Sequence, residues 1–213
     1  MLGALPPARP AAIRRNVLDI LRYALIDGRF HPDQEISDSA LAAEFQVSRG
    51  PVREALFILA EEGLIRHEHN RGFRIPKLTR EDLGQIVTVR QPLETVALED
   101  ARRAVTPADL ARLADKQRAI DEAYAAGGIA NCARAEFDFH QEIWDLSGNP
   151  WLAAALKRVC RPYFTYVSAF HLERKDMTAE LLHNQHEMYL RYLGGAIPET
   201  AADCVRYHLN LGE

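Results

Sequence analysis

Residues 36–75 read ISDSALAAEFQVSRGPVREALFILAEEGLIRHEHNRGFRI, and this stretch predicts two short helices followed by a β-hairpin. Ser37 can cap a first helix that runs to Phe45, because its hydroxyl can accept a hydrogen bond from the first turn. A second helix is expected over about 51–62, since proline is tolerated in a first turn and a glycine follows the end. Two short extended pieces on either side of residues 70–72 then form the hairpin.

The start of the second helix is the part of this stretch that predicts DNA binding. A short helix, a tight turn and a second helix place that start at the protein surface, where it can enter the major groove. Arg49 and Arg53 are four residues apart on one helix face, and arginine suits both a guanine edge and a phosphate. Ser48 and the backbone at Gly50 are placed to contact the phosphodiester strand.

The hairpin tip, with His69, Asn70, Arg71 and Gly72, is predicted to act as a wing beside the minor groove. An isolated pair of arginines on a helix is more often a solvated face than a DNA contact. The complete order of helix, turn, helix and hairpin favours DNA binding.

The strings LAAEFQVSRGPVREAL, EEGLI and RGF within this stretch resemble the DNA-binding domain of the GntR family of bacterial transcription regulators. The resemblance covers residues 12–76 and implies a winged helix-turn-helix. This chain departs from the family at Ser39, where many members carry an arginine or lysine. One contact to a phosphate or a base is therefore expected to be missing.

Helical patterns dominate the rest of the chain. Apolar residues recur at spacings of three and four from Pro10 to Asp27, and residues 1–10 before them are expected to form a loose arm. Thr79 and Thr106 begin good helix-start signals, one with an acidic residue three positions later and one with a proline next. Breaks are expected at residues 127–128, 147–150, 173–176 and 194–195.

The predicted fold is mainly α: a winged helix-turn-helix domain at residues 1–77, with three helices and a hairpin, and an all-α antiparallel bundle of about six helices at 78–213. The 213 residues are 47% hydrophobic and 26% charged, as in ordinary globular proteins. Residues 1–77 hold 11 Lys/Arg and 10 Asp/Glu, and residues 78–213 hold 15 Lys/Arg and 20 Asp/Glu. The net charges are therefore +1 and −5. No apolar run suits a membrane span or a signal peptide, so a cytoplasmic location is expected.

A second candidate site centres on residues 136–144, EFDFHQEIW, in a predicted helix. Glu136 and His140 are four residues apart and project from the same face of this helix. Asp138 is rotated by about 200° from His140 and points elsewhere. Glu136 is therefore the better candidate to act together with His140.

His186 and His208 lie in two helices that flank a turn containing Gly194-Gly195, at similar distances from that turn. Such residues come level with one another in an antiparallel helical hairpin. Three imidazoles and one carboxylate that project inward would suit zinc, nickel or another divalent ion. Histidines that only pack in a core remain the alternative, and the spacing alone does not decide between the two.

The strings VRQPLE, FHQEIWDLSGNP, QHEMYLRYL and RYHL are similar to the FCD ligand-binding domain of the FadR subfamily of GntR regulators, over about residues 78–212. In metal-binding members, three histidines and an acidic residue hold a divalent cation that a small carboxylate effector approaches. The resemblance therefore implies a metal site whose ligands are Glu136, His140, His186 and His208.

The resemblance also implies roles for residues around this site. Members often have aspartate where this chain has Glu136, which is one methylene longer. Arg90 matches an arginine that tends to face the effector, although an ordinary salt bridge with Glu94 is an equal alternative. His171 and His183 match no ligand position and are interpreted as surface or cavity-lining residues.

These features predict a homodimeric, metabolite-responsive transcription regulator that binds a palindromic operator, with repression favoured over activation. One alternative is a helical-bundle metalloenzyme that acts on a small organic acid. This alternative leaves the N-terminal motif unexplained. Another is a structural DNA-binding protein without a ligand, which leaves the inward histidines unexplained.

Overall fold

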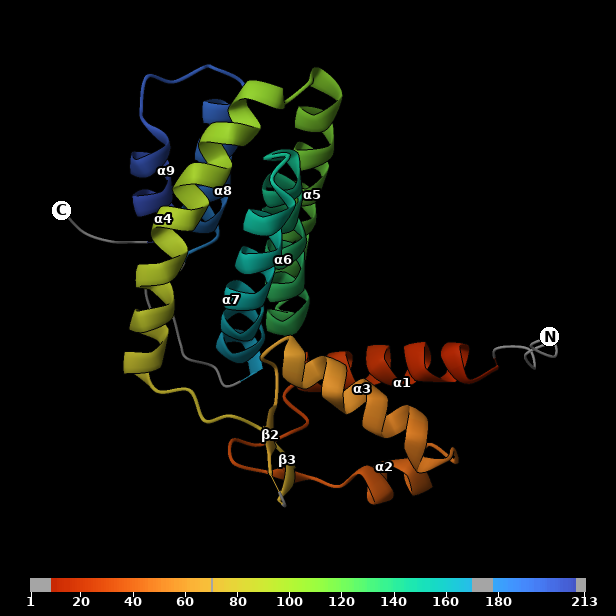
Figure 1. The fold of residues 1–213 in the computed structure, drawn as a ribbon. Helices are drawn as coiled ribbons and strands as arrows, with labels where there is room; N and C mark the ends of the chain where they lie inside the picture. The colour runs from red at the N-terminus through yellow and green to blue at the C-terminus, as the bar shows by residue number, and fades with distance from the viewer. Residues whose placement is uncertain (1–8, 70, 170–177, 210–213) are drawn as a thin grey trace. The chain divides into compact units, whose positions relative to one another are not determined.

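The computed structural model describes residues 9–69, 71–169 and 178–209, and the chain divides into two compact units at residues 77 and 78 (Figure 1). The fold is mainly helical, as predicted. The predicted arm at residues 1–10 lies largely outside the described residues, as do His171 and the break at 173–176.

In unit 1 the described residues form three helices and a small antiparallel sheet: α1 (Arg9–Ile26), β1 (Glu35–Ile36), α2 (Asp38–Glu44), α3 (Arg49–Glu61), β2 (Arg66–Glu68) and β3 (Gly72–Arg74). The apolar faces of α1 and α3 pack together, and Leu21, Val52 and Leu56 are almost completely buried there. The winged helix-turn-helix is therefore confirmed, with the core-facing side of α3 opposite its arginines.

The segment before α2 contains a strand that the sequence did not predict. Glu35–Ile36 form β1, which pairs antiparallel with β3, so the sheet has the order β1-β3-β2 rather than being the predicted two-stranded hairpin. Ile36 is buried opposite Phe73. A strand of two residues has no alternating pattern, which is why the sequence did not show it.

Helix α3 also begins earlier than the predicted start near Pro51. Its first residue is Arg49, and Ser48 is the N-cap residue in extended conformation. The proline therefore lies at the third helical position, where it still displaces no intrahelical hydrogen bond. This two-residue shift brings Arg49 into the first turn of the helix.

The described residues of unit 2 form the predicted bundle of six helices: α4 (Arg80–Ala104), α5 (Pro107–Ala125), α6 (Ile129–Leu146), α7 (Pro150–Ala169), α8 (Ala179–Leu193) and α9 (Ala201–His208) (Figure 1). Helices α4 and α5 start after Thr79 and Thr106, as their sequence signals predict. Both threonines form reciprocal capping boxes, and Thr200 does the same for α9. Gly127, Gly148 and Gly195 have positive φ at the turns. The described part of unit 2 contains no strand.

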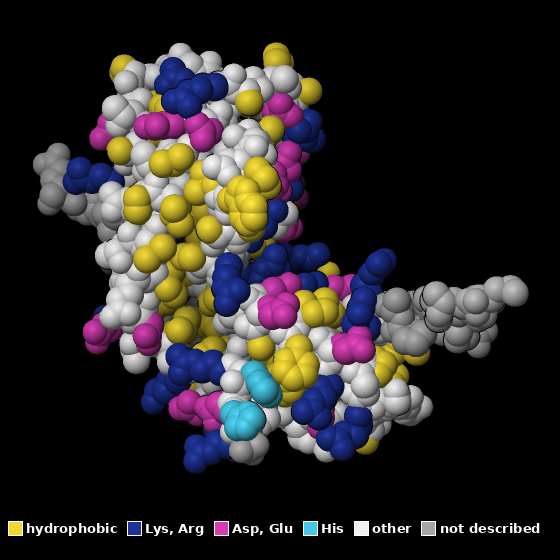
Figure 2. Space-filling view, viewed as in Figure 1, with side chains coloured by type: hydrophobic (Ala, Val, Ile, Leu, Met, Phe, Trp, Pro, Cys, Tyr) yellow, Lys and Arg dark blue, Asp and Glu magenta, His cyan; other side chains and the backbone are white. Residues whose placement is uncertain are grey.

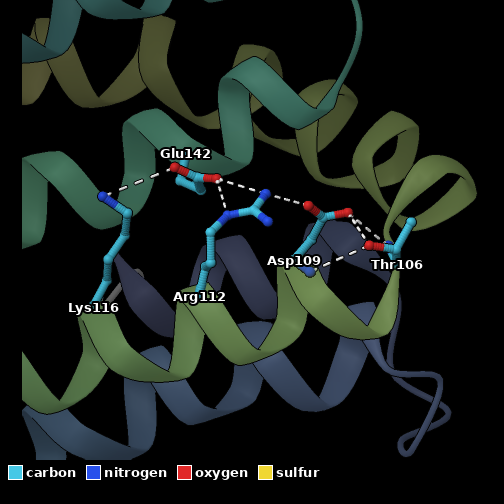
Figure 3. A network of polar contacts seen from close by, with 5 residues as sticks. All are labelled: Thr106, Asp109, Arg112, Lys116 and Glu142. Atoms are coloured by element: carbon cyan, nitrogen blue, oxygen red, sulfur yellow. Dashed lines mark hydrogen bonds and ion pairs between the residues drawn. The ribbon is translucent and has the colours of Figure 1, made fainter.

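The helices of unit 2 enclose an apolar core that includes Leu98, Phe139, Ile143 and Val205. At the surface, α5 and α6 are also joined by polar contacts (Figure 3). Arg112 on α5 bonds to Asp109 within its own helix and to Glu142 on α6, which Lys116 also approaches. The bundle thus combines a buried apolar centre with charged links on its outside.

Among the residues that the structure describes, no helix is long and apolar enough to cross a membrane.

Candidate functional site

Three helices of unit 2 bring His140, His186 and His208 together, although these residues are far apart in the sequence. They lie on α6, α8 and α9, and all three are buried. One ring nitrogen from each lies within 4.8 Å of the corresponding nitrogens of the other two. The ring centroids are 4.4 to 5.6 Å apart. We call these three residues the histidine triad.

The protonation states of His186 and His140 suit a cation. His186 Nδ1 lies 2.8 Å from the backbone oxygen of Leu182, so Nδ1 carries the proton and Nε2 the lone pair. Burial, with the charge of Arg90 and the proximity of His186, holds the pKa of His140 well below its ordinary value. Neutral imidazole is the form that binds metals.

A buried ion pair on α4 lies against the triad. Arg90 Nε is 3.0 Å from Glu94 Oε1, and both side chains are almost completely buried. Arg90 Nη2 lies 3.4 Å from His208 Nε2, and Glu94 Oε1 lies 3.8 Å from His140 Nδ1. The salt bridge that the sequence left as an alternative is therefore present, and it contacts two histidines of the triad.

Burial and pairing act in opposite directions on the two charges. Burial alone would lower the pKa of Arg90, but the charge of Glu94 keeps it above the ordinary value. Burial raises the pKa of Glu94, and the contacts with Arg90 and Trp144 offset part of that rise. Arg90 is also held over the rings of Tyr163 and Phe164, at 5.2 and 4.8 Å from their centroids.

The donor set of the triad fits a divalent metal ion. In a tetrahedral zinc site, with bonds of about 2.0 to 2.1 Å, donor nitrogens lie about 3.3 Å apart, so a small inward movement would let the triad bind one ion. Within the described residues, neither ring nitrogen of His140 has a hydrogen-bond partner, and nor does the buried Tyr189 hydroxyl. Buried polar groups in such a state are uncommon unless a ligand or water satisfies them. The positive charge of Arg90 disfavours a bound cation, and the negative charge of Glu94 offsets that of Arg90.

The structure does not group Glu136 with the triad: among the described residues, the potential metal-binding group consists of the three histidines. Glu136 is half-buried, and Asp138 is exposed, as helical geometry predicts. His183, one turn before His186 on α8, is half-exposed and bonds to Asp121 through Nδ1 at 2.8 Å. It lies at the surface, in agreement with its interpretation.

The predicted DNA-contacting residues of α3 share one exposed helix end. Arg49 and Arg53 have side chains 63% and 56% exposed, and both approach the carboxylate of Asp38. Ser48 makes no capping hydrogen bond through its side chain, so its hydroxyl is not used by the helix. Nothing lies within 4 Å of the position that a side chain at Gly50 would take, which leaves the backbone there accessible.

The wing is also exposed at its tip. Arg71 and Gly72 are exposed, and Gly72 has φ +81°, which closes the turn between β2 and β3. His69 is exposed beside them, whereas Asn70 lies outside the described residues. The predicted contact residues thus lie at two exposed places of unit 1, the start of α3 and the tip of the wing.

Some residues at these sites were not recognised from the sequence. Glu94 was noted only as a salt-bridge partner, and its place beside His140 depends on tertiary packing. Tyr189 stands three residues after His186 on the same helix face, a spacing that could have indicated it. Asp38 directly follows the N-cap of α2, which suggests only a helix start.

The chain belongs to the GntR family of bacterial regulatory proteins and carries an FCD domain: the GntR family model matches residues 13–75, and the FCD domain model matches residues 85–211. It is therefore a DNA-binding transcription regulator. This family consists of regulators, so the metalloenzyme alternative is not retained.

Individual relatives agree with this assignment. Over 200 residues, the chain is 32% identical to YdhC of Bacillus subtilis (strain 168), an uncharacterized HTH-type transcriptional regulator, with 89% of this chain and 84% of that protein covered. It is 44% identical over 84 residues to the gluconate operon transcriptional repressor of Bacillus licheniformis, covering 39% of this chain and 34% of that protein. The structure of E. coli McbR/YncC has the same fold, with a TM-score of 0.74, 22% identity and 93% of each chain covered.

Proposed function

We propose that this regulator changes its affinity for an operator when a small carboxylate metabolite binds at a divalent metal ion held by the histidine triad. The observation that carries the proposal is the triad itself: three buried histidines on three helices, with donor nitrogens within 4.8 Å of one another. Zinc or nickel suits such imidazole ligands. A bound ion would supply a positive centre for an effector carboxylate.

The charges around the triad favour an anionic effector. Three neutral imidazoles do not reduce the charge of a divalent ion, and Arg90 adds a fixed positive charge 3.4 Å from His208. Glu94 compensates only one of these charges. The carboxylate of Glu136 remains a predicted fourth ligand, and Arg90 a predicted contact of the effector.

In unit 1, the proposed DNA contacts are Ser48, Arg49, Gly50 and Arg53 at the start of α3 and Arg71 with Gly72 in the wing. Exposure of all six supports this assignment. Figure 2 shows Lys and Arg side chains on the visible face of this unit, interspersed with acidic ones. With such mixed charge, we expect DNA recognition to depend on a few well-placed side chains and not on a uniformly basic surface.

We further propose that residues 1–77 bind DNA, that residues 78–213 bind the effector, and that two copies form a dimer on a palindromic operator in the cytoplasm. Hydrophobic side chains lie along the visible face of the bundle (Figure 2). Val89 and Val96 on α4 are about half-exposed, and Trp151 at the start of α7 is 86% exposed. Contiguous exposed apolar patches mark interaction sites between proteins. Repression that the effector relieves is the proposed direction, in keeping with the repressor named above.

A thermal-shift screen tests this proposal. Metal-stripped protein is melted with individual divalent cations, each with and without a panel of small carboxylates, and unfolding is followed by tryptophan fluorescence. Both tryptophans, Trp144 and Trp151, lie in unit 2, so the signal reports on the unit that holds the triad. We expect a cation to raise Tm and a carboxylate to raise it further, since a ligand that binds the native state stabilises it.

The same screen on His208→Ala provides the control. If no cation or cation and acid pair raises Tm, or if the variant responds as the wild type does, the triad does not bind a metal and the proposed effector site fails. DNA binding by unit 1 would be unaffected by that result.

A further inference from the structure

Asp38 connects the first turn of α2 to both arginines at the start of α3. Its Oδ1 and Oδ2 accept hydrogen bonds from Arg49 Nη2 at 2.9 and 3.2 Å, and its Oδ2 lies 3.9 Å from Arg53 Nη1. The Asp38 side chain is only 16% exposed, whereas the two arginine side chains are more than half exposed. A largely enclosed carboxylate therefore lies against the ends of two exposed side chains.

We propose that Asp38 is a positioning residue for DNA recognition, which holds the guanidinium groups of Arg49 and Arg53 in a shared arrangement before DNA binds. The inference rests on the proposed role of the two arginines in contacting DNA. It adds that discrimination between DNA sequences depends on a residue that itself contacts no base.

Conformational freedom is the first reason for this role. A long arginine side chain has many rotamers, and fixing it on a base edge costs entropy unless it is already restricted. Both hydrogen bonds from Arg49 to Asp38 use Nη2. A guanidinium has five N–H donors in a fixed plane, so Nε and Nη1 can donate to DNA while Nη2 stays on the carboxylate.

Charge is the second reason. The carboxylate of Asp38 lies beside the surface that would face the phosphates, and it repels them. This repulsion acts on DNA of any sequence. In a non-specific complex, however, the arginines must also leave Asp38 to reach phosphates, whereas at base acceptors in the right places they gain directional bonds while the contact with Asp38 persists. Asp38 therefore weakens non-specific binding more than specific binding, which is one way to build specificity.

Asp38 also has a structural role that the test must separate from positioning. As the first residue of α2 it interacts favourably with the helix dipole, while Ser37 accepts the capping hydrogen bond from the Ala40 amide. Asp38→Asn keeps the size of the side chain and removes the charge. Asp38→Glu keeps the charge at a greater length. Glu44→Gln on the same helix, where the exposed carboxylate has no pairing with either arginine, is the matched control for charge.

The experiment measures the affinity of the full-length protein for two DNA duplexes by fluorescence anisotropy at fixed salt. One duplex is selected by the wild-type protein from a random-sequence library, and the other has the same length and composition in scrambled order. We expect the affinity ratio of selected to scrambled DNA to fall about tenfold in Asp38→Asn, chiefly through tighter binding of the scrambled duplex. Asp38→Glu should recover most of the ratio, and Glu44→Gln should leave it within about twofold of the wild type.

A double-mutant cycle decides whether Asp38 acts through the arginines. In an Arg49→Ala/Arg53→Ala background, Asp38→Asn should no longer change the affinity ratio. An unchanged ratio in Asp38→Asn alone, or an equal fall in both backgrounds, overturns the inference. If the ratio stays at the wild-type value in the Arg49→Ala and Arg53→Ala single variants, the proposed arginine contacts fail as well, which distinguishes the two failures. Should Asp38→Asn not fold, judged by circular dichroism, Asp38→Ser is measured against the same criteria.

Discussion

The start of α3 and the histidine triad place their polar groups in opposite surroundings. Arg49 and Arg53 are more than half exposed, with a single acid between them. The triad is buried, and its histidines lie against an ion pair that is buried too. At the first site a partner from outside completes the contacts, whereas at the second most of the charge compensation is already inside the protein.

This difference teaches what a substitution should do at each place. An exposed arginine can be removed with little effect on folding, because water replaces its contacts, so its loss should appear in DNA binding. Removal of a buried charged group should destabilise the fold, because its partner then stays buried without either the ion pair or water to satisfy it. Variants of the buried site should therefore alter the stability of unit 2 or its response to ligands, and variants of α3 should alter neither.

The largest effect on stability is expected at the buried ion pair. Arg90→Met leaves Glu94 buried without its partner, so we expect a loss of about 3 to 5 kcal/mol in the free energy of unfolding of unit 2. Urea unfolding followed by tryptophan fluorescence measures this loss. The double variant Arg90→Met/Glu94→Met should recover most of it, since it removes both charges. A single variant as stable as the wild type would show that the pair is not enclosed in solution.

The next effect is expected in metal binding, where α8 offers a matched pair of histidines. His186→Ala should weaken binding of a divalent cation by more than about 100-fold, since loss of groups that only support a ligand costs 10- to 100-fold. His183→Ala, one turn earlier at the surface, should bind the ion as the wild type does. Calorimetric titration of metal-stripped protein provides the affinities. Equal losses in both variants would mean that the triad is not the binding site.

A third comparison concerns the exposed arginines. Arg49→Ala and Arg53→Ala should each lower the preference for the selected duplex by about 1 to 3 kcal/mol if these side chains contact bases, while Tm stays close to the wild-type value. Arg29→Ala is the control, because Arg29 is exposed in the same unit but lies in the loop after α1. Anisotropy titrations measure the preference. A large fall in Tm instead would place the arginines among the groups that maintain the fold.

The contrast between the sites also shows what a sequence can reveal. The helices and caps of the winged helix-turn-helix follow from local sequence patterns, so they and the exposed arginines could be predicted from a continuous stretch. The strand β1 was missed because Ile36 is buried by pairing with a strand almost forty residues later. Similarly, the triad histidines could be named from helical spacing and family resemblance, but the approach of Glu94 to His140 depends on how α4 packs on α6, which no local pattern encodes.

The smallest effect is expected in the polar contacts around the start of α5, which resemble the buried ion pair in chemistry but include the half-exposed Arg112 beside the largely buried Asp109 (Figure 3). Thr106→Ala removes the cap of α5 and should cost about 1 kcal/mol of stability. The bonds from Thr106, together with Arg112, lower the pKa of Asp109. Because the pKa of Asp109 is lower in the folded state, its ionised carboxylate stabilises the fold fully above the pKa of the unfolded state, which is about 3.9. This stabilisation is lost as the pH falls through the pKa of the folded state. Urea unfolding between pH 7 and pH 3 should therefore show an acid-dependent loss in the wild type that is smaller in Asp109→Asn. Identical pH profiles of the two proteins would mean that the Asp109 carboxylate does not contribute to stability.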